Sequence, residues 1–475
     1  MAKNKKEMTP EERLAAALVP EEEQPYELPE GWKWVYGKGF FLPMETEYPT
    51  GDSFRYIDIE SIDNSVQRVR CPKNLPVKKA PSRASRKLHI GDTLFSMVRP
   101  YLKNIAYIDE EYSDCIGSTG FYVCTPTPLV DRHYLYWLMV SPFVVNGLNH
   151  FMKGDNSPSI RKGDIEKFVY PIPLLSEQQR LVARIESLFA KLDAAKAKVQ
   201  AVLDAHETRK AALLDEAFRG KLTETLDETS TAEDFLDEIY AVKAQLVKEK
   251  KIKKPKRLPS MTDEEKPFEI PNTWRWVRFG DILRIINGDR GKNYPSKKEL
   301  HEAGDIPFIS ALNIQDNTIA TEHLLYVDEE RYNLLRSGKL KKGDLVLCIR
   351  GSLGKNGRYP FDRGAIASSL VIIRSYLDND AMYDYISFYL DSLLFKNEMS
   401  KYDNGTAQPN LGAGDLSLFA VPLPPLAEQH EIVAVLDRLL GREEEVRQSA
   451  ESVLAAIDSM KQSILARAFR GELGA

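Results

Sequence analysis

One unit of sequence occurs twice in this chain, and the duplication limits the folds that the chain can adopt. PLPPLAEQHEIV at 422–433 nearly repeats PIPLLSEQQRLV at 171–182. EEEQPYELPEGWKWV (21–35) matches DEEKPFEIPNTWRWV (263–277), and AFRGKL (217–222) matches AFRGEL (468–473). Two copies of one sequence are expected to form the same structural unit. Residues 21–222 and 263–473 are therefore two copies of one unit.

The two copies agree at their ends and differ in their middles. HIGDTLFSMVRPYLKN (89–104) resembles KKGDLVLCIRGSLGKN (341–356) only loosely. Each copy consists of a short opening segment, a variable segment, a proline-rich boundary and a long helix. We call the opening segment, the proline-rich boundary and the long helix the frame of each copy. The frame is repeated, whereas the variable segment differs between the copies.

The segments after the prolines carry the signals of long helices. Glu177 and Glu428 place an acid in the first turn, directly after the prolines, and Gly220 and Gly471 end the pattern. Apolar residues then recur at alternating steps of four and three, which indicates a coiled-coil seam of about 45 residues, about 65 Å, per helix. The seam positions are Leu181, Ile185, Leu188, Leu192, Ala195, Val199 and Val202 in the first copy, and Ile432, Leu436, Leu439, Val446, Ala450, Val453, Ile457, Met460 and Ile464 in the second.

The two helices are expected to pack on each other in antiparallel orientation; the alternative is a helical hairpin inside an ordinary core. Glu443 stands where the first copy has Leu192. It is either a device that fixes the register or a solvated edge, and we favour the edge.

The middles predict mixed α/β domains. Short strand-like runs such as DTLFSMV (92–98) and SLVIIRS (369–375) alternate with turns, and apolar helical runs at 132–149 and 382–399 precede the prolines. The expected fold class is α+β, with two mixed α/β domains joined by two long helices packed as an antiparallel coiled coil, related by a pseudo-twofold duplication. The expected parts are a tail at 1–20, domains at 21–174 and 262–425, and helices at 175–222 and 426–475.

Residues 223–261 form a linker whose charge changes along its length. TAEDFLDEIYAVKAQLV (231–247) has the pattern of a short amphipathic helix. The following run, KEKKIKKPKRLPS (248–260), carries seven bases and one Glu between Lys248 and Arg257. It is interpreted as a solvated tether, with an arm that contacts phosphates or a partner as the alternative.

Composition excludes several classes of protein. Only four cysteines occur, without zinc spacing, so neither a disulfide framework nor a structural zinc is expected. The basic start lacks an apolar signal region and no long apolar run exists, so a soluble cytoplasmic protein is expected. The net charge of −5 gives no support to nucleic-acid binding, although a local basic groove remains compatible with it.

Catalytic motifs are missing. GSLGKNG (351–357) superficially suggests a phosphate loop, but its glycines are too close to the lysine and Asn356 replaces the hydroxyl that binds Mg²⁺. No dinucleotide, zinc-protease or serine-hydrolase motif was found, and none of the seven histidines recurs at matching positions in both copies. We therefore expect no catalytic residue, no cofactor-binding residue and no metal ligand on this chain.

Polar loop residues in both middles are the remaining candidates. Arg can bind guanine and Asn or Gln adenine through base edges, while Lys and Ser hold phosphates. The candidate DNA-binding residues of the first copy are Arg99, Tyr101, Lys103, Asn104, Lys153, Asn156, Ser157 and Arg161. Those of the second copy are Arg290, Lys292, Asn293, Arg350, Ser352, Lys355, Asn356, Lys401, Tyr402, Asn404, Thr406 and Gln408.

The chain resembles the specificity (S) subunit, HsdS, of type I restriction–modification enzymes. The resemblance rests on the doubled LPEGWKWV/IPNTWRWV, PIPLLSEQQRLV/PLPPLAEQHEIV and AFRGKL/AFRGEL motifs, which together cover nearly the whole chain. It implies two target-recognition domains, each reading one half of a split, asymmetric double-stranded DNA sequence, with the helices as the conserved spacer.

The resemblance also implies partners. Two methyltransferase (M) subunits, which use S-adenosylmethionine, and two restriction (R) subunits, which use ATP and Mg²⁺, would dock on this chain. A fused enzyme is disfavoured because no N-P-P-[FY] motif occurs. A coiled-coil scaffold with two modules that bind ligands other than DNA stays open as an alternative.

Overall fold

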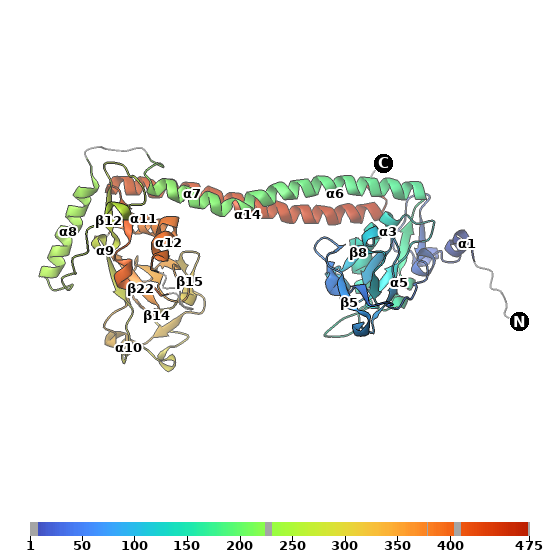
Figure 1. Cartoon of the computed structure of the whole chain (residues 1–475), viewed down its shortest axis with the longest axis horizontal. Coiled ribbons are helices and arrows are strands. Elements are labelled where there is room, and N and C mark those ends of the chain that lie inside the picture. The colour runs from blue at the N-terminus through green and yellow to red at the C-terminus, as the bar shows by residue number, and fades with distance from the viewer. Residues whose placement is uncertain (1–7, 224–229, 378, 403–409, 474–475) are drawn as a thin grey trace. The chain divides into compact units, whose positions relative to one another are not determined.

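The structure is a computed structural model that describes residues 8–223, 230–377, 379–402 and 410–473 (Figure 1). The chain divides into two compact units, unit 1 (1–201 and 450–475) and unit 2 (202–449). Each unit contains one diverged middle and a part of both long helical segments. Within the described residues, no helix is long and apolar enough to cross a membrane. The α+β class is confirmed.

Short sheets build the middle of unit 1. Strand β1 (Lys33–Tyr36) pairs antiparallel with β11 (Val169–Ile172), so the two ends of the middle meet. A four-stranded sheet has the order β5-β2-β9-β6, and its strands span Lys73–Pro76, Ser53–Ile57, Ile116–Ser118 and Ala84–Lys87. A three-stranded sheet has the order β10-β7-β8, and its strands span Phe121–Cys124, Thr93–Ser96 and Ile105–Tyr107. A two-stranded ribbon joins β3 (Ile62–Asp63) to β4 (Arg68–Val69), and α3 (Arg132–Val140), α4 (Pro142–Asn149) and α5 (Lys162–Lys167) follow the sheets.

Unit 2 repeats this frame around a larger sheet. β12 (Arg275–Arg278) pairs with β23 (Ala420–Leu423) as β1 pairs with β11. A six-stranded sheet has the order β13-β22-β19-β20-β16-β15, from Leu283–Asn287, Leu370–Ser375, Leu345–Cys348, Asn356–Arg358, Thr318–Ile319 and Ile314–Gln315. A four-stranded sheet has the order β17-β14-β21-β18, and these strands span Leu325–Val327, Ile306–Ile309, Gly364–Ile366 and Lys339–Leu340. The helices of this middle are α9 (Phe279–Ile282), α10 (Glu329–Leu334), α11 (Asp380–Asp391), α12 (Leu393–Ser400) and α13 (Ala413–Leu416).

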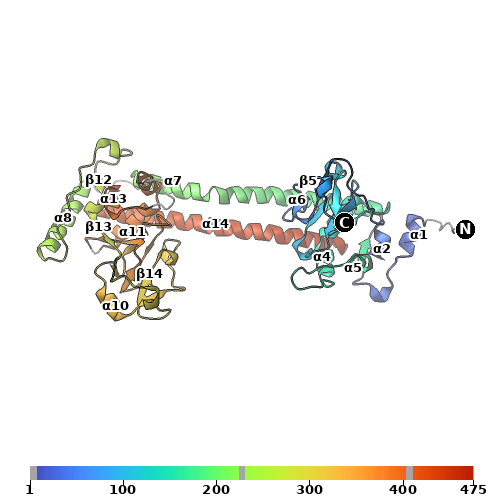
Figure 2. The ribbon, with the colours of Figure 1, turned by 60° about the horizontal axis from the view of Figure 1, so that its bottom comes forward.

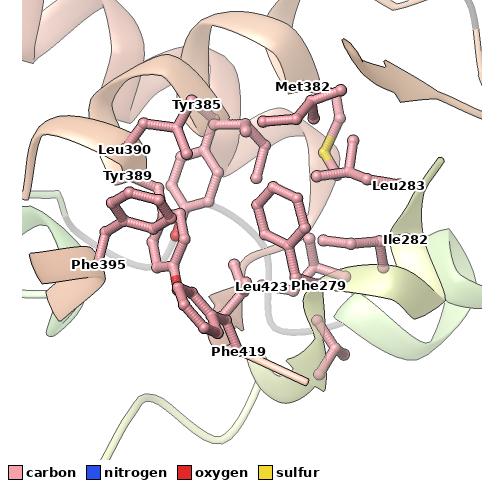
Figure 3. Packing of buried hydrophobic residues seen from close by; sticks show 14 of the residues in the cluster. Phe279, Ile282, Leu283, Met382, Tyr385, Tyr389, Leu390, Phe395, Phe419 and Leu423 are labelled. Carbon is pink, nitrogen blue, oxygen red and sulfur yellow. The ribbon is translucent and has the colours of Figure 1, made fainter. Parts of the chain in front are cut away.

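Corresponding tyrosines fix the proline boundaries of both units. Tyr134 on α3 donates its hydroxyl to the carbonyl of Pro171 at 2.9 Å, and Tyr385 on α11 donates to Pro422 at 2.6 Å. Figure 3 shows Tyr385 and Tyr389 of α11 packed with Phe395, Phe419 and Phe279 in the core of unit 2. Burial of these rings stabilises the fold, and the hydroxyl bonds orient the start of each long helix.

The long helices are antiparallel within each unit. In unit 1, Lys196 on α6 (Leu175–Asp204) pairs with Asp458 on α14 (Leu426–Phe469) at 2.8 Å, and Asp193 pairs with Lys461. Residue numbers therefore rise along one helix as they fall along the other. The first long helical segment is interrupted by a turn at Ala205, which separates α6 from α7 (His206–Phe218). Antiparallel packing of the two segments agrees with the expectation.

The seam is only partly buried. Ile185, Ile432, Leu436 and Ile457 are buried in it. By contrast, Val202, Val446, Val453 and Met460 remain 38–51% exposed, although the heptad pattern predicts them at the interface. Two helices can cover only one side of each other, so an apolar stripe wider than that side stays in solvent.

Glu443 is held by the neighbouring helix, so the expectation that it forms a solvated edge is wrong. It accepts a hydrogen bond from Nε of Arg209 at 2.8 Å, its side chain is only 21% exposed, and His206 lies 3.7 Å away. A cation on α7 facing this carboxylate favours one register of the two segments.

The repeated ends of the helices pack on the other copy, against a helix of its middle and against its opening segment. Phe218, from the first copy, packs edge-on against Tyr385 of unit 2, and Phe469, from the second, packs against Tyr134 of unit 1. The carbonyl of Phe469 also accepts from the Tyr26 hydroxyl at 3.0 Å. Gly471 has φ +76°, and a Cβ there would collide with Pro29. Each unit thus contains the end of the other repeat, which explains why AFRG occurs twice.

The linker forms the predicted amphipathic helix. α8 (Ala232–Lys248) buries Phe235, Leu236 and Ile239 in the core of unit 2, and Ala232 donates its N–H to the carbonyl of Thr273. Both views place α8 beside β12, and Figure 2 also shows β13 on this side of the unit (Figures 1 and 2). Before the first copy, α1 (Pro10–Ala15) begins with a capping box in which Thr9 is the N-cap residue. The basic run after α8 is mostly exposed, which fits both a tether and an arm that contacts phosphates or a partner.

A substitution of Glu428 gives a pH-dependent prediction. This carboxylate is buried, accepts from Trp274 Nε1 at 2.9 Å and from Thr223 at 3.2 Å, and has a pKa raised by burial. Glu428→Gln should therefore raise the free energy of unfolding of unit 2 at pH 7, because the ionised form disfavours the folded state. The gain should fade as pH drops through the raised pKa and vanish below the unfolded value of about 4.3.

Denaturant unfolding followed by hydrogen exchange in unit 2, repeated from pH 7 to pH 4, measures this effect. Glu177→Gln is the matched control, because Glu177 occupies the same position in unit 1 but is more exposed and pairs with Arg180. A gain for Glu428→Gln that persists undiminished at pH 4 would contradict the assignment.

Candidate nucleic-acid interface

In unit 1 the fold joins two loops that are far apart in the sequence. Val98 forms a bridge with Ser159, and Ile160 donates its N–H to the carbonyl of Met97 at 2.9 Å. Arg99 donates a hydrogen bond from Nη2 to the carbonyl of Asn156 at 2.8 Å. Loop 97–104 and loop 153–161 therefore form one surface, and Arg99, Asn156 and Ser157, which the sequence named separately, lie together.

This loop surface of unit 1 is polar, basic and open. Tyr101 is 46% exposed, and Lys153, Asn156, Ser157 and Arg161 are exposed. Arg99 and Lys103 adopt left-handed backbone conformations with φ +48° and +53° on the two sides of a short 3₁₀ turn. Non-glycine residues in this region carry strain that the surrounding structure must hold, and such sites are frequent in binding loops.

Unit 2 joins the corresponding loops in the same way. Arg350 forms a bridge with Asn410, and Leu411 donates its N–H to the carbonyl of Ile349 at 2.9 Å. Nε of Arg350 donates to Oδ1 of Asn410 at 2.7 Å. Ser352 and Lys355, from the same loop, are exposed. Asn404, Thr406 and Gln408 lie outside the described residues.

The second basic loop of unit 2 follows strand β13. Asp289 is buried, and its carboxylate accepts N–H groups of Arg290 and Arg336, both at 2.7 Å. Arg290 and Lys292 are exposed and Asn293 is half-buried, so two cations stand on a loop whose backbone is anchored from inside.

Five of the candidates occupy structural positions. Asn104 and Asn356 are 6% and 2% exposed, and Asn356 donates to Asp391 at 3.1 Å. Lys103 donates to Gln462 of α14 at 3.1 Å, and burial lowers the pKa of its ammonium group. Lys401 pairs with the buried Glu398, and Tyr402 stacks on Phe419. In this structure these five groups serve the packing of the loops.

The sequence reasoning missed the turn between β15 and β16. Gln315, Asp316 and Asn317 line, with Lys355 and Asn356, a hollow of about 330 Å³. Asp316 and Asn317 have φ +45° and +58°, as a two-residue hairpin turn requires. The signal was present as the Asp-Asn pair between apolar residues in NIQDNTI (313–319). These polar groups belong beside the candidates of loop 349–356.

No cluster of side chains that could hold a metal ion occurs within the described residues. The surface carries cations, amides and hydroxyls, together with the carboxylates of Asp155 and Asp316. Such groups can bind phosphates and base edges by hydrogen bonding, and this chemistry requires neither a nucleophile nor a metal.

Comparison with known proteins gives one consistent result. The family model described as "Type I restriction modification DNA specificity domain" matches residues 53–204 and 271–451. The EcoAI specificity subunit of Escherichia coli is 23% identical over 89% of this chain and 80% of its own length. The HsdS subunit of Thermoanaerobacter tengcongensis superposes with TM-score 0.63 and 26% identity, over 95% of this chain and all of that chain. A chain from a structural study of assembly and conformational transition of the type I R-M system gives TM-score 0.70, 25% identity and coverage of 94% and 100%.

Proposed function

Because the chain belongs to the type I restriction–modification DNA specificity family, we propose that it is the sequence-specific DNA-binding subunit of a cytoplasmic type I complex. The observation that carries the proposal is the same loop pairing in both units. The guanidinium of Arg99 binds the backbone carbonyl of Asn156 in unit 1, and the guanidinium of Arg350 binds the side-chain amide oxygen of Asn410 in unit 2, so each unit brings an arginine and an asparagine together from two loops. Arginine and asparagine side chains are the commonest readers of guanine and adenine in the major groove.

We further propose that the target is bipartite and asymmetric. Two units with the same frame can bind two half-sites, and their differing loops would read different sequences. The antiparallel helices are proposed to set the number of unread base pairs, because two readers on one duplex must keep a fixed distance.

Docking of two M and two R subunits is also a proposal. It is supported by the exposed apolar stripe of α14, where Val446, Val453 and Met460 are seven residues apart and 43%, 45% and 51% exposed. Such a stripe at heptad spacing fits further helices from a partner. The residues of α8 and of 223–247 are a second candidate surface for docking.

Catalysis is assigned to the partners. In this proposal the M subunits bind S-adenosylmethionine and methylate adenine, and the R subunits use ATP and Mg²⁺. The chain itself then supplies only binding and position, which requires no cofactor on it.

The proposal is tested by producing the chain with its M subunits in a host and mapping methylated adenines across the genome. We expect one split, asymmetric sequence to be methylated wherever it occurs, and to lose methylation when this chain is omitted. If no sequence is methylated by an assembled and active complex, the chain is better explained as a scaffold with modules that bind other ligands.

A further inference from the structure

A cationic groove lies on unit 2 between the basic linker and the free edge of its large sheet. The groove has a volume of about 440 Å³ and is lined by the linker residues 252–256 and Leu258, by residues 283–286 of β13, and by residues of α9 and α13. Lys253, Lys254, Lys256 and Arg284 are its charged lining residues, and no carboxylate lines it. Figure 2 shows β13 and α13 on the side of unit 2 next to α8, from which the linker continues.

Salt bridges do not neutralise these cations, although Arg284 lies near the Asp344 carboxylate that pairs with Arg374. Within the part of the chain that the structure describes, none of Lys253, Lys254, Lys256 and Arg284 forms an ion pair. The neighbouring Arg374 pairs with Asp344, and Lys251, which does not line the groove, pairs with Glu249 at 2.8 Å. Four positive charges held around one groove repel one another, so each of them would stabilise an anion bound among them.

The shape of the linker at the groove suits an extended polyanion. Residues 252–258 contain no helix or strand, and Pro255 prevents the helix α8 from continuing through them. From Lys253 to Lys256 an extended chain spans about 10 Å, the axial rise of about three phosphates along one DNA strand. β13 is the edge strand of its sheet, so backbone groups along one side of it are free of sheet pairing.

The elements that line the groove lead along the chain into the candidate DNA-binding loops. β13 leads directly into the loop of Arg290 and Lys292, and α13 directly follows Asn410 and Leu411, which bind loop 349–356. A docking site for an acidic protein would need no such continuity. DNA therefore explains the arrangement better than a protein partner does.

We propose that this groove is a second, sequence-independent DNA contact, in which Lys253, Lys254, Lys256 and Arg284 bind phosphodiester groups next to the half-site read by unit 2. The inference rests on the proposed function, because the duplex is the ligand of both. The base edges remain the task of the loops, while the groove adds affinity that is equal for all sequences.

The test compares two variants of equal charge change from the same basic run. Lys253→Gln, Lys254→Gln and Lys256→Gln are combined in the groove variant, and Lys248→Gln, Lys250→Gln and Lys251→Gln in the control variant, whose residues do not line the groove. Each is assembled with the M subunits, and its affinity is measured from 50 to 200 mM salt for a duplex with the methylated sequence and for a scrambled duplex.

We expect the groove variant to lower the slope of log K against log salt by about 2–3, since each phosphate contact contributes about 0.9. Its affinity should fall by the same factor for both duplexes, its methylated sequence should not change, and the control variant should alter the slope by less than about 1. If the groove variant and the control variant change the salt slope equally, the groove is not a DNA-binding site. An unchanged slope with weakened assembly would assign the lysines to an acidic protein partner instead.

Failure of this inference is separable from failure of the proposed function. If the parent complex does not prefer any sequence over the scrambled duplex, the proposed function fails, while the comparison of salt slopes on the scrambled duplex still tests the groove. If the parent complex is specific and the groove variant keeps its slope, only the groove assignment fails.

Discussion

Exchange of residues 36–170 for the corresponding segment of another specificity subunit should replace one half of the methylated sequence and leave the other half unchanged. The segment begins and ends in the β1–β11 pair, where Tyr36 lies opposite Val169 and Val35 opposite Tyr170. The exchange therefore keeps the frame and removes every candidate base contact of unit 1. Each altered base pair costs about 1–3 kcal/mol, so a changed half-site should abolish methylation of the original sequence.

The measurement is the map of methylated adenines in a host that carries the exchanged chain and its M subunits. The matched experiment replaces residues 279–419, which lie between β12 and β23 in unit 2, and should change the other half. A change of both halves by either exchange would show that the two units do not read independently. If neither exchange alters the methylated sequence, the residues that contact the bases lie outside the diverged middles.

Substitution of Asp344 should destabilise unit 2 strongly, by about 3–5 kcal/mol. Its side chain is 2% exposed and binds Arg374 through two hydrogen bonds, Nε to Oδ1 at 2.7 Å and Nη2 to Oδ2 at 2.6 Å. Asp344→Asn removes the negative charge and leaves the guanidinium of Arg374, itself 14% exposed, without a counterion. Removal of one partner of a buried ion pair costs more than the pair contributes, because the remaining charge stays desolvated.

Unit 1 contains the control for this prediction. Asp92 occupies the same place before β7 as Asp344 before β19, and it is also buried, at 1%. Within the described residues no arginine pairs with it, since Thr125 stands at the position of Arg374; the ring of His89 lies 3.4 Å away, and burial raises the pKa of Asp92. Asp92→Asn should therefore cost little or stabilise unit 1 at pH 7. Hydrogen exchange of β7 and β19 in the full chain distinguishes the two units, and equal destabilisation by both substitutions would contradict the role of Arg374.

Prediction from the sequence worked where one pattern was repeated. The duplication, the two long helices, the α+β class and the amphipathic helix at 231–247 follow from motifs and from helical periodicity, which are local properties of the chain. The family also follows from these motifs, because they belong to the frame. By contrast, the division at Ala205 and the ion pair of Glu443 depend on contacts between distant segments, which periodicity does not record.

The candidate site was predicted by residue type and only partly by position. Arg99, Asn156 and Arg350 were named from polar loops, and the structure brings their loops together in each unit. Asn104 and Asn356 were chosen for the same reason and are buried, because a loop asparagine can satisfy neighbouring groups as readily as a ligand. The turn at Gln315–Asn317 was missed because its place beside Lys355 and Asn356 depends on contacts between segments distant in the sequence.

The sequence by itself determined that the chain has two copies of one frame, where each copy begins and ends, and which residue types its loops carry. Only the tertiary structure decided that each unit is completed by the end of the other repeat, through Phe218 against Tyr385 and Phe469 against Tyr134. It also decided which cations stay without salt bridges around the groove of β13. The physical reason is that packing and ion pairing join residues far apart in the chain, whereas a sequence pattern reports only the preferences of neighbouring residues.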